Sequence, residues 1–193
     1  MKKFILSGVL LIGSMLAVKA QDVKFGVKGG LNLSKLTSTN GSKVLAGFNA
    51  GALVNFKLDN NWAIQPEVQY STQGTKVKND ILWGAVTTEG TMKLDYINVP
   101  VLAQYHIIDE FYLEGGPQIG FLTSAKAKSG GVSVDVKDNM KTVDFGLNFG
   151  FGYKFDMGLG IGARYNFGLT NVYDSDKINR KNSVAQIDLF YIF

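Results

Sequence analysis

Few residues of this chain have the type and spacing that catalysis requires. His106 is the only histidine, and Asp109 and Glu110 follow it closely. Nucleophilic catalysis needs a nucleophile and a base within hydrogen-bond reach, and no serine is obviously placed beside His106. Glu67 and Glu114 could act as a carboxylate pair only if a substrate reached them. The sequence therefore predicts that the chain is not an enzyme.

The residue types also argue against a metal site. With no cysteine and one histidine, only an oxygen-rich Ca²⁺ site remains open. Asp174 and Asp176 have a suitable spacing, but the rest of a calcium loop is missing, so we expect a solvated external loop. No metal and no other cofactor is predicted.

Charged residues inside otherwise alternating apolar segments are the strongest chemical signal. Buried charges persist only if they are paired. Asp188 is expected near Lys28 and Arg164, with Glu67 and Glu114 reaching the same basic groups. The sequence thus predicts that these charges form one ion-pair cluster in the interior of the folded domain. Its members are Lys28, Glu67, Glu114, Asp144, Lys154, Arg164 and Asp188.

The segments that carry these charges alternate between apolar and polar residues with period two. At the C-terminus, Phe193, Tyr191 and Leu189 share one face and Asp188 lies on the other. Such alternation is typical of a strand with one face toward apolar surroundings. Eight strands are expected, at 23–34, 47–56, 62–71, 96–106, 111–121, 143–156, 159–168 and 185–193.

The N-terminal segment, residues 1–20, has the features of a secretory signal peptide: a basic start, an apolar stretch and a cleavage site after Ala20. It contains three lysines and no acid, so about +1 of the net charge of +4 remains for residues 21–193. So small a net charge does not indicate binding to nucleic acid. Residues 21–193 are expected to form one domain.

The connections between the segments alternate in length. The predicted signal peptide, the eight period-two segments and the alternating connection lengths together predict an all-β fold. This fold is an eight-stranded antiparallel up-and-down transmembrane β-barrel in the outer membrane. Both termini would lie in the periplasm, at the end with the short turns. The short connections lie at 58–61, 107–110 and 156–158, and the long ones at 35–43, 75–90, 125–141 and 171–182.

A soluble barrel or β-sandwich is the competing fold, in which the apolar faces would form the core. Two features weigh against it. The opposite faces are rich in glycine and poor in charge, and aromatic residues such as Trp62, Tyr105 and Tyr153 lie near strand ends, as in the aromatic girdle of a membrane barrel.

Several motifs resemble a known family. The segments 25–32 (FGVKGGLN) and 94–102 (LDYINVPVL), and the glycine-rich strands at 143–168, are similar to the "porin family" or PorT-like outer-membrane barrels of Bacteroidetes, with an OmpA/OmpX-like eight-stranded barrel. The resemblance covers essentially the whole of residues 21–193. It implies an outer-membrane barrel, and one namesake member is associated with a protein-secretion and gliding system.

The interior of an eight-stranded barrel is only wide enough for side chains to fill it. The first functional hypothesis is therefore a closed, charge-plugged barrel with a structural or surface-interaction role carried by its external loops. A narrow or gated channel for ions or small solutes is the second, and a component of a protein-secretion system is the third.

The expected partners are outer-membrane lipid, the barrel-assembly machinery during biogenesis, and an unidentified surface ligand or secretion partner. Leu189, Tyr191 and Phe193 resemble the signal that the assembly machinery reads. The candidate contacts in the loops are Ile81, Leu82, Trp83, Lys126 and Lys128.

Overall fold

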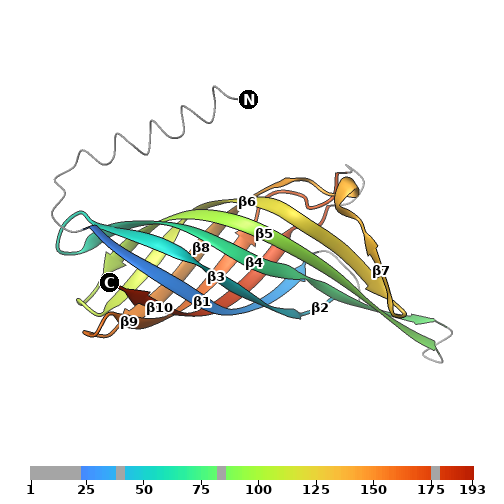
Figure 1. The fold of residues 1–193 in the computed structure, drawn as a ribbon, viewed down its shortest axis with the longest axis horizontal. Coiled ribbons are helices and arrows are strands. Elements are labelled where there is room, and N and C mark those ends of the chain that lie inside the picture. The colour runs from blue at the N-terminus through green and yellow to red at the C-terminus, as the bar shows by residue number, and fades with distance from the viewer. Residues whose placement is uncertain (1–22, 38–41, 82–85, 175–178) are drawn as a thin grey trace, which may run out of the picture.

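The computed structural model describes residues 23–37, 42–81, 86–174 and 179–193 (Figure 1). The predicted signal peptide lies outside the described residues. No described residue belongs to a helix that is long and apolar enough to cross a membrane. The elements are β1 (Val23–Leu36), β2 (Ser42–Lys43), β3 (Leu45–Lys57), β4 (Trp62–Ile81), β5 (Val86–His106), β6 (Phe111–Ser129), β7 (Val132–Asp135), the 3₁₀ helix η1 (Lys137–Asn139), β8 (Val143–Lys154), β9 (Leu159–Gly168) and β10 (Asn182–Ile192).

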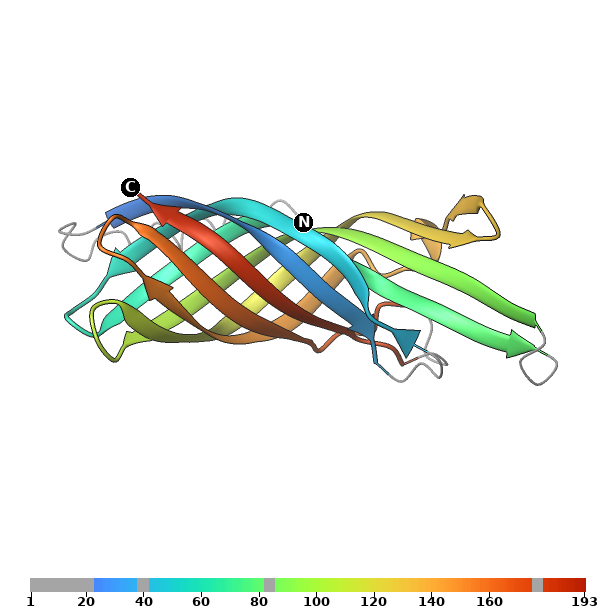
Figure 2. The same cartoon turned by 90° about the horizontal axis from the view of Figure 1, so that it is seen from below.

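Eight long strands close into an antiparallel barrel in the order β1-β3-β4-β5-β6-β8-β9-β10 (Figures 1 and 2). The ring is completed by β10 and β1, which pair from Gly26 with Ile192 to Leu36 with Asn182. Closure leaves no free edge within the barrel wall. The predicted fold class is confirmed.

Side-chain direction follows the period-two pattern of the sequence. The outward positions are apolar and exposed, for example Phe25 at 61% and Leu31 at 67%. The inward positions are polar and buried, for example Asn32, Gln69 and Glu67. A soluble barrel needs the opposite arrangement, because apolar side chains must leave water. The outward surface is therefore suited to lipid.

Outward aromatic residues gather at the end of the barrel that carries the short turns. Trp62 and Tyr105 pack with ring centroids 5.0 Å apart, and Tyr191 and Phe193 with centroids 5.3 Å apart. Amphipathic rings at this level are typical of the interface between lipid and water. We call this end the short-turn end and the opposite one the extended end.

Two of the expected long connections contain more strand than predicted. β4 continues to Ile81 and pairs along its length with β5, ending at Ile81 opposite Val86. β6 continues to Ser129 and pairs with β7. The sequence predicts loops here because polar and charged residues are frequent in these segments. Residues 74–81, 86–94 and 125–129, together with β7, form what we call the extended sheet (Figure 2).

Candidate functional site

Five charged side chains meet in the lumen at the middle of the barrel. They come from five different strands and are all buried. We call them the lumen charge cluster. It consists of Lys28 on β1, Glu67 on β4, Glu114 on β6, Arg164 on β9 and Asp188 on β10.

Arg164 is the centre of this cluster. Its two terminal nitrogens each donate to one carboxylate oxygen of Glu67, both at 2.9 Å, and its Nε donates to Oε1 of Glu114 at 2.8 Å. Lys28 Nζ lies 2.9 Å from Asp188 Oδ2 and 3.4 Å from Glu67 Oε2. A planar guanidinium suits this bidentate recognition, so the cluster cross-links the barrel walls.

Glycines on the intervening strands give the charged side chains room to meet. Strand register places Gly150 between Glu114 and Arg164, and Gly51 opposite Lys28. A Cβ at Gly150 would lie 2.6 Å from the Ala163 carbonyl oxygen and 3.1 Å from Glu114 Oε1. The absence of a side chain there lets Arg164 reach past β8.

The remaining acceptor capacity of the three carboxylates is taken up by amides. Gln65 donates to Glu67 at 2.9 Å, Gln104 donates to Glu114 at 3.1 Å, and Asn49 donates to Asp188 at 2.8 Å. Three carboxylates face two cations, so these neutral donors stabilise the surplus negative charge. Together the charges and amides fill the lumen at this level.

A second buried cluster, which is apolar, lies at the extended end of the barrel. The chain between Val136 and Met140, and the segment at Val172 and Tyr173, fold against the mouth and are joined by a bridge between Met140 and Tyr173. The apolar cluster there, which we call the outer cap, consists of Leu36, Leu94, Tyr96, Leu122, Ala125, Met140 and Val172.

On the side toward the short turns, an apolar layer of Leu53, Tyr112 and Phe190 underlies the charge cluster. A Cβ added at Gly152 would overlap the Tyr112 ring, so glycine makes room for this layer. The cavity between this layer and the cluster measures about 10 Å³, about the size that holds one water molecule.

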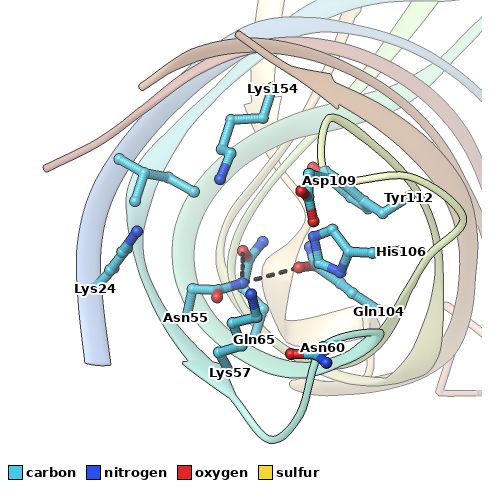
Figure 3. A pocket seen from close by; sticks show the side chains of 11 residues that line it. Lys24, Asn55, Lys57, Asn60, Gln65, Gln104, His106, Asp109, Tyr112 and Lys154 are labelled. Atoms are coloured by element: carbon cyan, nitrogen blue, oxygen red, sulfur yellow. Dashed lines mark hydrogen bonds between the residues drawn. The ribbon is translucent and has the colours of Figure 1, made fainter. Parts of the chain in front are cut away.

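Beyond that layer lies an open pocket of about 190 Å³ at the short-turn end, which we call the vestibule (Figure 3). Its floor is made of amides: Asn55 Nδ2 donates to Gln65 Oε1 at 3.1 Å and to Gln104 Oε1 at 2.8 Å. Charged and titratable groups surround the mouth. They are Lys24, Lys57, His106, Asp109 and Lys154.

Two predicted members of the ion-pair cluster lie elsewhere. Asp144 is near the extended end, where it accepts a hydrogen bond from Asn182 Nδ2 at 2.7 Å. Lys154, the last residue of β8, lines the vestibule. The alternation of a strand defines the face of a residue but not its height along the barrel axis, and height separates these two residues from the other five.

His106 lies at the short-turn end, as expected from its position in the sequence. Its ring packs against Tyr112 with centroids 5.3 Å apart. In the ranges that the structure describes, no group of three or more metal-binding side chains could hold a metal ion. The vestibule lysines Lys24 and Lys57 were missed as site residues because each alone is an ordinary strand-end lysine.

The loop candidates divide into two groups. Leu82 and Trp83 lie outside the described residues, and Ile81 is the last residue of β4. Lys126 and Lys128 are exposed on β6 in the extended sheet. Strand register places Lys126 beside Lys93, which pairs with Asp95 at 3.6 Å.

A closed ring of eight antiparallel strands, apolar outside and charged within, defines a transmembrane β-barrel of the outer-membrane type. Residues 19–174 match the outer membrane protein beta-barrel domain family, and the chain belongs to that family. No curated protein is significantly similar to it in sequence.

Solved structures of surface barrels share the fold. Neisserial surface protein A is similar with a TM-score of 0.57 and 16% identity, covering 90% of this chain and 100% of that one. Ail, the attachment invasion locus protein of Yersinia pestis, is similar with a TM-score of 0.50 and 19% identity, again covering 90% and 100%. At these identities the likeness concerns the fold.

Proposed function

We propose that this protein is an integral outer-membrane barrel with a closed lumen, whose role is structural or surface-interacting and is carried by the extended sheet. The proposal is supported by two buried groups of side chains inside the barrel, the lumen charge cluster and the outer cap. A barrel filled in this way has no path for a solute, so its contacts are made on its surface.

The proposed orientation puts the short turns and both termini in the periplasm. Outer-membrane barrels have short periplasmic turns and longer external segments, and the extended sheet then projects outside the cell. The outward apolar band contacts outer-membrane lipid. Leu189, Tyr191 and Phe193 point outward on the last strand, where the assembly machinery can read them during insertion.

Conductance tests the closed lumen. The refolded protein is inserted into planar bilayers after a shift between unboiled and boiled gel samples verifies the barrel. We expect no channels above those of lipid alone. Reproducible channels that change with Arg164→Ala, but not with the exposed control Lys126→Ala, would establish the narrow channel instead.

The surface role is supported by lysines on the outward face of the extended sheet. Lys126 lies between Lys93 on β5 and Asp135 on β7, and Lys128 and Lys76 both lie opposite Thr91. Cationic side chains just beyond a lipid-facing band attract anionic headgroups and surface glycans. The anionic lipopolysaccharide of the outer leaflet is the ligand class that fits this position.

A charge series tests this role. In vesicles containing lipopolysaccharide, the wild-type barrel should unfold at a higher temperature than in neutral phosphatidylcholine. The triple variant Lys76→Gln/Lys126→Gln/Lys128→Gln should lose that gain, and the matched Lys→Arg triple should keep it. Equal gains for all three proteins would refute a lysine-mediated surface contact.

The resemblance to PorT-like proteins of Bacteroidetes leads to one further experiment. If the barrel serves protein secretion, deletion of its gene should lower the amounts of secreted proteins. Unchanged secretion would leave the surface role as the only one supported.

A further inference from the structure

The vestibule at the short-turn end has no part in the closed-lumen role or in the surface role. It is a dead-end pocket of about 190 Å³, several times the roughly 30 Å³ that one water molecule occupies in the liquid. Its floor is the amide layer of Asn55, Gln65 and Gln104, and its mouth is open (Figure 3). A small solute can therefore enter it but cannot pass through the barrel.

The charges around this pocket are unbalanced. Lys24 on β1, Lys57 at the end of β3 and Lys154 at the end of β8 are spread around it, and His106 and Asp109 lie across the pocket from Lys24 (Figure 3). Asp109 is the single carboxylate among the residues that line it. Among the described residues, none of the three lysines forms an ion pair. Three ammonium groups thus line one pocket with one carboxylate, and the carboxyls of Asp59 and Asp156 interact with Lys57 and Lys154 from outside the lining.

The floor of the pocket contributes little positive charge of its own. The side-chain amide nitrogens of Gln65 and Gln104 donate to Glu67 and Glu114, away from the mouth. Asn55 donates to both glutamines. The fully charged donors available to a bound molecule are therefore the lysine ammonium groups at the rim, beside the neutral donors of Asn60 and Tyr112.

We propose that the vestibule binds a small multivalent oxyanion group of the phosphate class. Several ammonium groups around one pocket favour a ligand that carries more than one negative charge, and lysine binds phosphate as a point charge. The low-dielectric wall concentrates the field of these charges at the mouth. The ligand is either a free phosphate ion or a phosphate group on a larger molecule.

Titration calorimetry tests the site on the refolded full barrel in zwitterionic detergent. The probes are inorganic phosphate, for the free ion, and glycerol 3-phosphate, for a phosphate carried on an organic group. Lys24→Gln/Lys57→Gln/Lys154→Gln should weaken phosphate binding by at least about tenfold, as expected when charge-assisted contacts are removed. The charge-matched triple Lys35→Gln/Lys43→Gln/Lys141→Gln changes lysines at the extended end. It should leave phosphate binding unchanged.

Asp109→Asn gives a test of opposite sign. Removing the only lining carboxylate should strengthen phosphate binding, because it removes a repulsive charge from the mouth. The gel shift between unboiled and boiled samples verifies that each variant is folded. No binding of either probe to the wild type, equal losses in both triples, or weaker binding by Asp109→Asn would overturn the proposal. None of these results depends on whether the extended sheet binds lipopolysaccharide.

Discussion

Arg164 and Glu67 lie on opposite walls of the barrel and meet across its lumen. Three strands separate β9 from β4 in either direction around the ring, and 97 residues separate the two in sequence. Their bidentate contact, at 2.9 Å for each hydrogen bond, therefore spans the barrel from wall to wall. It fixes the separation of strands that share no backbone hydrogen bond.

Replacing Arg164 by methionine should strongly destabilise the barrel. The change leaves Glu67 and Glu114 buried without their main cation, and breaking a buried pair in this way costs about 3–5 kcal/mol. Urea unfolding in detergent measures the loss. Lys128→Met, an exposed control, should change stability by less than about 0.5 kcal/mol, and equal effects of the two variants would contradict a stabilising cluster.

Gly150→Ala should disturb the contact between Arg164 and Glu114 without altering any charge. The new Cβ would press on the Ala163 carbonyl oxygen at 2.6 Å, and overpacking of this kind costs about 1–3 kcal/mol. Gly29→Ala is the matched strand control, because its new Cβ would lie 3.6 Å from the Asn49 carbonyl oxygen, an ordinary van der Waals contact. The prediction fails if both variants unfold at the same urea concentration.

Met140→Ala should loosen the outer cap. Met140 is 6% exposed within that cluster, and truncation of a buried methionine to alanine costs about 2–5 kcal/mol. Met157, on a short turn and 72% exposed, provides a control of the same residue type. Thermal unfolding should separate the two variants, and a Met157→Ala protein as unstable as Met140→Ala would count against the cap.

Asp59 should titrate below the ordinary range in the first short turn. Its Oδ1 accepts hydrogen bonds from the backbone N–H groups of Asn61 and Trp62, both at 2.8 Å, and these bonds lower the pKa of the carboxyl. A lowered pKa stabilises the turn above the ordinary pKa, and this stabilisation is lost as the pH falls through the lowered value. NMR titration should show a lower midpoint for Asp59 in the folded barrel than in an unfolded peptide.

Phe193→Asp should reduce insertion in cells. The side chain is 72% exposed on the outward face, so its loss removes little packing and acts on recognition by the assembly machinery. The amount of heat-shifted protein in isolated outer membranes measures the effect, and Phe193→Tyr should behave as the wild type. Normal insertion of Phe193→Asp would show that the terminal aromatic is not read.

Period two in the sequence was sufficient to predict the strands and the direction of their side chains. The adjacency of Lys28 and Asp188 followed from it, because closure must pair the first strand with the last. Height follows from the position of a residue along its strand, which places Lys28, Arg164 and Asp188 near the middle of the barrel, but the ion-pair hypothesis grouped inward charges by face alone. Lys154 and Asp144 were therefore assigned to the cluster although they lie near opposite ends of β8.

The full lengths of β4 and β5 could not be predicted from the sequence pattern. Beyond Thr75 polar and charged residues such as Lys76, Lys78 and Asp80 are frequent, and a composition of this kind is also typical of an exposed loop. The vestibule could not be predicted from the sequence either. Its lysines come from β1, β3 and β8, and only the closed ring brings Lys24, Lys57 and Lys154 around one pocket.

The pairing of β1 with β10 determines the order in which the protein can fold. Lys28 and Asp188 stand on the first and last strands of the barrel, so their ion pair forms only when the chain has been made to its end. In a sheet that has not yet closed, Arg164 and Glu67 would lie far apart and would still be accessible to water. Long-range pairing of this kind is slow. Pairing of β1 with β10 is therefore the step that completes the burial of these charges.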